Sequence, residues 1–108
     1  MEVVCELMKL KPEHVKEYVE MHENTWPELI QAIRESGFIE EYIYMLDNLV
    51  MVIMKCEDFD RSRKNLLQKP VFQRWTTKVQ SMLMEDEKFF HTKEKIIDLK
   101  PIWNLDDF

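Results

Sequence analysis

Two segments of the chain have the residue pattern of strands joined by a tight turn. Residues 38–46 are rich in aromatic and β-branched side chains, which favour extended backbone. Residues 49–54 form an unbroken apolar run, which is typical of a strand covered on both faces. Asp47 and Asn48 between them tolerate positive φ, so we predict a hairpin. Near the N-terminus, residues 2–10 alternate loosely between apolar and polar side chains and predict another strand.

Between these strands, residues 15–33 have large apolar side chains at the spacing of an amphipathic helix, and His22 lies within that stripe. Pro27 interrupts the pattern, because proline lacks an amide hydrogen and clashes with the carbonyl four residues earlier. We therefore predict a break at residues 24–26. The Thr-Trp-Pro-Glu sequence around this proline matches a capping box that begins a second helical segment. Gly37 supplies the left-handed residue that follows this segment.

The second half of the chain predicts two further helices and a final strand. Residues 58–69 favour a short helix, and Pro70 begins another helix with a clear apolar stripe. Residues 84–93 are charged and predict a loop. Residues 96–102 predict the last strand, with Pro101 at a strand end or a sheet edge.

The order of these elements is the split βαβ pattern of a ferredoxin-like α+β domain. All 108 residues form one domain, 1–108, with helices on one face of a four-stranded antiparallel sheet. The apolar run 49–54 indicates that the other face is covered as well, because a half-solvated strand would alternate. No element remains to cover it, so we predict a symmetric homodimer.

Composition excludes several classes of function. An average chain of this length has about seven glycines, whereas this one has a single glycine, which excludes glycine-rich nucleotide-binding loops. A net charge of −6 argues against nucleic acid as a partner. No apolar run is long enough for a membrane helix, and the acidic N-terminal residues have no basic leader. Cys5 and Cys56 have apolar neighbours and are expected to be reduced, so we expect a cytoplasmic protein.

His22 is the first candidate for chemistry. A lone histidine on an apolar stripe is often a buried residue with satisfied nitrogens. Its neighbours on the stripe are Tyr18 and Trp26, amphipathic aromatic residues that are typical of a pocket wall. The residues themselves leave both interpretations open. The three histidines have no metal-ligand spacing, so no metal centre is predicted.

Trp75 and Glu41 are the other unusual residues. Trp75 lies on a helical apolar stripe, where it either fills the core or stacks against a sugar ring. Glu41 shares a predicted strand face with apolar residues, so its carboxylate lies at an edge or lines a polar pocket.

The Tyr-x₃-His-x₃-Trp-Pro-Glu-Leu cluster that begins at Tyr18 resembles the L-rhamnose mutarotase family. Two further matches follow it in order along nearly the whole chain: Ile43-Tyr44 with Asp47, and Gln73-Arg74-Trp75. The resemblance implies a dimeric α+β barrel that interconverts the α and β anomers of a 6-deoxy-hexose without a cofactor.

The resemblance also implies roles for individual residues. His22 matches the proton donor of the family, Tyr18 matches a sugar-binding tyrosine, and Trp75 matches the first of two adjacent sugar-contacting tryptophans. The second tryptophan is Thr76 here.

A family tyrosine aligns with Glu41, and Tyr42 beside it would substitute only after a one-residue shift. Such a shift moves a side chain to the other face of the sheet. Both residues are therefore candidates for the pocket wall, and the two departures leave L-rhamnose as the leading substrate rather than the established one.

Mutarotation protonates the ring oxygen and removes the proton of the anomeric hydroxyl. We expect His22 to protonate the ring oxygen, with Tyr18 or Glu41 orienting the anomeric hydroxyl. Trp26 and Trp75 would hold the ring. Two alternatives come from other classes: a cofactor-free or haem-dependent oxygenase, on the fold alone, and a non-catalytic sugar-binding dimer.

Overall fold

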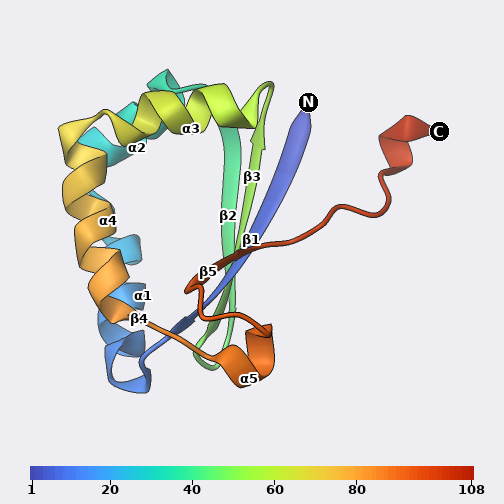
Figure 1. Ribbon diagram of the computed structural model, residues 1–108. Coiled ribbons are helices and arrows are strands. Elements are labelled where there is room, and N and C mark those ends of the chain that lie inside the picture. Colours follow the sequence, from blue (N-terminus) through green and yellow to red (C-terminus); the bar gives the residue numbers. More distant parts are fainter.

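An antiparallel sheet with helices packed on one face forms the body of the protein in the computed structural model, which describes all residues 1–108 (Figure 1). The elements are β1 (Glu2–Leu10), α1 (Val15–Glu23), α2 (Pro27–Glu35), β2 (Phe38–Leu46), β3 (Leu49–Cys56), α3 (Phe59–Leu67), α4 (Pro70–Met82), β4 (Leu83–Met84), α5 (Glu87–Phe90) and β5 (Ile96–Asp98), with 3₁₀ turns at Pro12–His14 and Leu105–Asp107. No helix is both long enough and apolar enough to cross a lipid bilayer.

The sheet has the strand order β2-β3-β1, and β4 and β5 both pair with β1. The predicted order of elements and the ferredoxin-like α+β class are confirmed. The expected single strand over 96–102 is wrong in detail, because five strands are present and two short ones share the position beside β1. The predicted loop 84–93 contains α5, which begins when the Asp86 side chain accepts a hydrogen bond from the Phe89 amide.

Strand register decides which side chains face the helices. Glu41 pairs with Met54, and Glu6 pairs with Val52. Met54 and Val52 are buried beneath the helices. Because directly paired residues lie on the same face of a sheet, both carboxylates point toward the helix layer.

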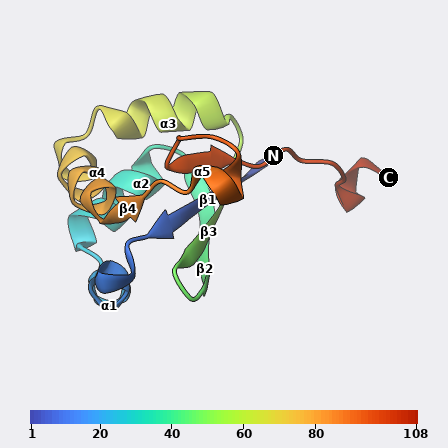
Figure 2. The ribbon, with the colours of Figure 1, turned by 60° about the horizontal axis from the view of Figure 1, so that its bottom comes forward.

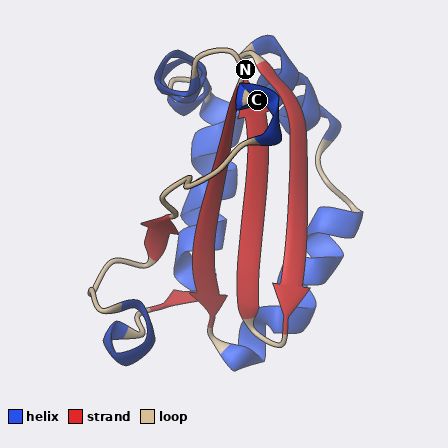
Figure 3. Cartoon of the chain, turned by 90° about the vertical axis from the view of Figure 1, so that its right-hand side faces the viewer, coloured by secondary structure: helices blue, strands red, loops and turns tan.

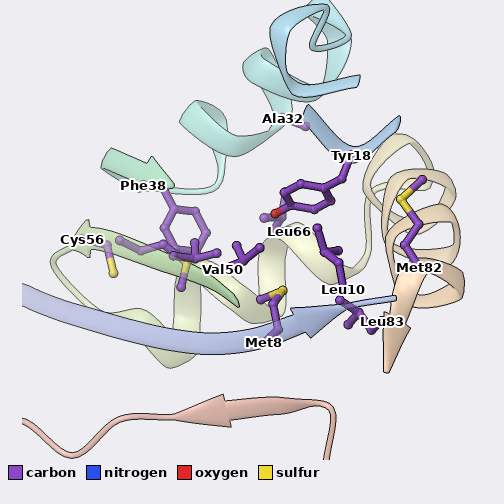
Figure 4. Packing of buried hydrophobic residues seen from close by; sticks show 12 residues of the cluster. Met8, Leu10, Tyr18, Ala32, Phe38, Val50, Cys56, Leu66, Met82 and Leu83 are labelled. Carbon is purple, nitrogen blue, oxygen red and sulfur yellow. The ribbon is translucent and has the colours of Figure 1, made fainter. Parts of the chain in front are cut away.

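The core lies between that face and the helices (Figure 4). It contains Met8, Leu10, Tyr18, Ala32, Phe38, Val50, Val52, Met54, Cys56, Leu66, Met82 and Leu83. Cys56 is fully buried and Cys5 is half-buried, and both are free thiols. Along β3, buried side chains that face the helices alternate with half-buried side chains that face the other way. The run 49–54 is therefore apolar on both faces of the sheet, although helices cover only one of these faces.

The predicted break between α1 and α2 is confirmed. α1 ends at Glu23, and Pro27 is the first residue of α2. The capping box is wrong, because no side chain caps the N-terminus of α2. The Thr25 hydroxyl instead donates a hydrogen bond to the carbonyl of His22, so it closes the end of α1 rather than beginning α2.

The other face of the sheet has no helix layer over it, and only the C-terminal segment passes in front of it (Figure 3). On β2, Tyr42 is 48% exposed, Tyr44 is 61% exposed and Leu46 is 70% exposed. Beyond β5, the chain leaves the body and runs to the C-terminus away from the helices, with Trp103 and Phe108 stacked on each other (Figure 2). Because Tyr42, Tyr44 and Leu46 are neighbours on one face of β2, they form a continuous apolar patch rather than the scattered apolar residues of a typical surface.

Gly37 is held by two separate constraints. Its φ is +107°, and a Cβ there would lie 2.6 Å from the hydroxyl oxygen of Ser62 in α3. The predicted left-handed residue after α2 is thereby confirmed, and it also permits the close approach of α3.

We expect Gly37→Ala to lower the free energy of unfolding by at least about 1–2 kcal/mol, the cost of a side chain in left-handed backbone. The clash with Ser62 adds to this cost. Urea unfolding followed by circular dichroism measures it. Gln68→Ala is the control, because Gln68 ends α3 in ordinary right-handed backbone. Equal unfolding midpoints for Gly37→Ala and the wild type would contradict the assignment.

Candidate functional site

A cavity of about 440 Å³ lies between the sheet and the helices. A second, outer chamber of about 560 Å³ adjoins this inner chamber and is lined by α2 and β2. The two chambers share six wall residues: His22, Phe38, Glu41, Ile43, Phe72 and Trp75. These volumes lie in the range of small-molecule binding sites, and the walls are mostly apolar with a few polar groups, as such sites require.

His22 lies in the last turn of α1, half-buried in the cavity wall. Its Nδ1 is 2.7 Å from the carbonyl oxygen of Tyr18. A carbonyl can only accept a hydrogen bond, so Nδ1 must carry the hydrogen. In the neutral ring Nε2 then holds a lone pair and is the nitrogen not bonded to Tyr18, and His22 lines both chambers. Burial lowers the pKa of His22 below its ordinary value of 6.5, and the bond to Tyr18 partly opposes that shift.

Two aromatic rings pack against the imidazole and restrict its orientation, and a third ring packs against one of them. The Tyr18 ring lies 4.2 Å from the His22 ring, and the Trp75 ring meets His22 edge-on at 5.1 Å. Trp26 meets Trp75 edge-on at 5.0 Å. Trp75 lines both chambers, whereas Trp26 lines neither and supports Trp75 from behind. The structure therefore brings His22, Tyr18 and Trp75 together and leaves Trp26 outside the cavity wall.

Tyr18 is the most deeply buried of the candidates. Its side chain projects into the core over Met8 and Val50, and it lines the inner chamber (Figure 4). Burial, followed by the nearby charge of Glu41, raises the pKa of Tyr18 well above its ordinary range. The phenol therefore stays protonated near neutral pH and can donate a hydrogen bond to a ligand.

Glu41 faces the same cavity from β2. Burial among the cavity walls, and secondarily the charge of Glu6, raises the pKa of Glu41 to about 6, although the residue keeps contact with solvent through the cavity mouth. Of the two sequence-based interpretations of Glu41, edge or pocket, both describe it: the residue lies on an edge strand and lines the pocket.

Glu6 was not identified as a site residue from the sequence. It lies on β1 and is only 9% exposed. Burial raises its pKa, Arg63 at 3.9 Å opposes this shift, and Asp98, its partner on β5, adds to it. The signal that could have found it was the one used for Glu41: a carboxylate at an inward position of a strand.

The last two candidates lie at the margins of the site. Thr76 lines the inner chamber, but its hydroxyl donates to the carbonyl of Phe72 at 2.9 Å within α4. Tyr42 pairs with Ile53, so it faces the uncovered side of the sheet and reaches only the rim of the outer chamber. Tyr42 therefore does not replace Glu41 in the inner wall, because the β2 register places alternate residues on opposite faces.

Comparison with known proteins gives one consistent family. The family model described as L-rhamnose mutarotase matches residues 3–105. The L-rhamnose mutarotase of Burkholderia ambifaria (strain MC40-6) is 31% identical over 77 residues, which cover 69% of this chain and 73% of that protein.

Two solved structures are similar in fold. An L-rhamnose mutarotase from Formosa agariphila is 20% identical, with a TM-score of 0.74 over 97% of this chain and 99% of that chain. An antibiotic biosynthesis monooxygenase is 12% identical, with a TM-score of 0.65 over 94% of this chain and 99% of that chain. At these sequence identities, the similarity to both structures supports the fold alone.

We expect the pKa of His22 to be lower in the folded protein than in the unfolded chain, and we expect the neutral ring to carry its hydrogen on Nδ1. Because the folded pKa is lowered, His22 contributes stability above its unfolded pKa and loses that contribution as the pH falls through the folded pKa. Long-range ¹H–¹⁵N NMR spectra across pH report both the tautomer and the pKa. Titration at or above the value in the urea-unfolded chain, or a neutral ring protonated on Nε2, would contradict this geometry.

Proposed function

Because this chain belongs to the L-rhamnose mutarotase family, we propose that it interconverts the α and β anomers of L-rhamnose, with His22 as its proton-transfer residue. The family places the protein among isomerases that act on carbohydrates. The sugar itself and the residues that act on it are the content of the proposal. The observation that carries it is the half-buried His22 on the wall of a cavity large enough for a pyranose, oriented by a backbone carbonyl and by the Tyr18 and Trp75 rings.

The chemistry required is modest. The ring oxygen accepts a proton, the anomeric hydroxyl loses one, the ring opens to the aldehyde, and closure on the other face gives the second anomer. An imidazole in protonated form gives its Nε2 proton to the ring oxygen and recovers it on closure. No redox group and no covalent intermediate is needed for these steps.

Side chains around His22 supply the remaining contacts. Trp75 offers an apolar surface for the C–H groups of a sugar ring, with Trp26 behind it. Tyr18 supplies a protonated phenol, and Glu41 supplies a carboxyl group that accepts hydrogen bonds from sugar hydroxyls. Thr76 and Tyr42 border this space without reaching its centre.

The oligomeric part of the proposal is a homodimer, formed through the uncovered face of the sheet. The exposed Tyr44 and Leu46 on β2 and the half-buried outward side chains of β3 support it. A second copy covers this face by the same residues on both subunits. We further propose a cytoplasmic location, which the free thiols of Cys5 and Cys56 support, because such thiols persist in reducing compartments.

We expect His22→Ala to reduce the enzyme-dependent rate of anomer exchange of L-rhamnose by about 10²–10⁴-fold, because it removes the general acid–base group. Saturation-transfer NMR between the two anomeric signals measures the rate. His14→Gln is the matched control, since His14 lies at the N-cap of α1 and lines neither chamber.

Equal rates for His22→Ala and the wild type would remove His22 from the mechanism. Sugar binding without accelerated exchange in the wild type would favour a non-catalytic sugar-binding dimer, and a haem absorbance band on reconstitution would favour the oxygenase alternative. A panel with L-fucose and common hexoses tests whether L-rhamnose is preferred.

We expect Tyr44→Lys to shift the protein from dimer to monomer, because it places a charge in the centre of the proposed apolar interface. Size-exclusion chromatography with light scattering measures the mass. Val19→Lys is the control, since Val19 is an exposed apolar residue in the helix layer. A wild-type protein that is monomeric at micromolar concentration would contradict the dimer.

A further inference from the structure

Two carboxylates share the cavity of His22, on adjacent parts of the sheet. Glu41 on β2 and Glu6 on β1 flank the central strand β3, and both side chains point to the helix layer. Glu6 has an ion-pair partner in Arg63, with 3.9 Å between the charged atoms. Glu41 has no ion-pair partner, so its charge is not neutralised by a neighbouring cation.

The surroundings of Glu41 raise the pKa of its carboxyl group toward the range in which it can both accept and release a proton. Burial and the charge of Glu6 raise its pKa to about 6, near the working range of an acid–base group at neutral pH. The charged and titratable groups that line the two chambers with Glu41 are Glu6 from β1, Tyr18 and His22 from α1, Arg34 from α2, Arg63 from α3, and Glu40 and Tyr42 from its own strand. The residues that α4 contributes include Phe72 and Trp75 and no titratable side chain.

Mutarotation requires an acid and a base at the same moment, and His22 provides only one of them. Tyr18 does not serve as the second group, because its pKa is raised and the phenol keeps its proton. Glu41 belongs to the sheet and His22 to the helix layer, so a sugar bound in the cavity has one of these groups on each side.

Building on the proposed mutarotase function, we propose that Glu41 is the second catalytic residue, which exchanges a proton with the anomeric hydroxyl while His22 exchanges one with the ring oxygen. The resemblance described above aligns Glu41 with a tyrosine of the family. The assignment therefore concerns a position at which this chain departs from that family pattern.

The step balances with a single proton shared by the pair. Protonated His22 gives its Nε2 proton to the ring oxygen as the bond from C1 to that oxygen breaks, and the Glu41 carboxylate takes the proton of the anomeric hydroxyl as the carbonyl forms. The C1–C2 bond rotates. On closure the ring hydroxyl returns its proton to His22, and the Glu41 carboxyl returns its proton to the carbonyl oxygen. Both residues end as they began.

The test compares Glu41→Gln with Glu20→Gln, which changes an exposed glutamate on the outer side of α1. Saturation-transfer NMR gives kcat and KM for L-rhamnose across pH. We expect Glu41→Gln to lower kcat by about 10²-fold or more with KM changed less than about threefold. We also expect it to lose the acid-side fall of the pH profile, which a purely structural role would not affect. Glu20→Gln should match the wild type.

Chemical rescue provides a second readout. Glu41→Ala leaves space for a small carboxylate, so added formate should restore part of its exchange rate while leaving His22→Ala unchanged. Circular dichroism checks that each variant is folded. If the wild type accelerates exchange and Glu41→Gln keeps its kcat and its acid limb, this assignment is overturned while the proposed function stands. If the wild type gives no acceleration, the proposed function fails first.

Discussion

Helices cover only one face of the sheet, and this constraint shapes everything else in the molecule. The covered face holds both the apolar core and the cavity, since the helices pack over the sheet without filling all the space between the two layers. The opposite face has no covering layer in the chain, yet its outward side chains are as apolar as those of an interior strand. A cavity on one side and a bare apolar surface on the other are therefore two consequences of the same arrangement.

Within the cavity, backbone geometry sets the chemical state of the central side chain. The helix ends at Glu23, and the hydrogen bond from Nδ1 of His22 to the Tyr18 carbonyl commits one ring nitrogen to the protein. The other nitrogen remains for a ligand. The packing of Trp75 against the ring restricts rotation, so the imidazole is oriented before any ligand arrives. Such preorganisation is what proton transfer to a bound sugar demands.

The two carboxylates differ because their neighbours differ. Glu6 is almost fully buried, but Arg63 lies within reach of it, whereas Glu41 is more exposed to solvent and forms no ion pair. Burial acts in the same direction on both, so each holds its proton more tightly than a free carboxylic acid does. A pocket that holds a histidine of lowered pKa, a protonated tyrosine and a carboxyl group of raised pKa suits reversible proton exchange better than nucleophilic chemistry.

Local residue patterns were sufficient to predict the strand-helix-strand-strand-helix-strand order, the break before Pro27 and the left-handed Gly37, because each depends on neighbours a few residues away. The family resemblance pointed to His22, Tyr18 and Trp75 in one place. Contacts between segments distant in the sequence decided the remaining features. These are the separate strands β4 and β5, the position of Trp26 outside the cavity wall, and the placement of Glu6 and Glu41 in the same cavity. Register across β1, β3 and β2 determines which side chains face each other, and a register is a property of the folded sheet rather than of any one strand.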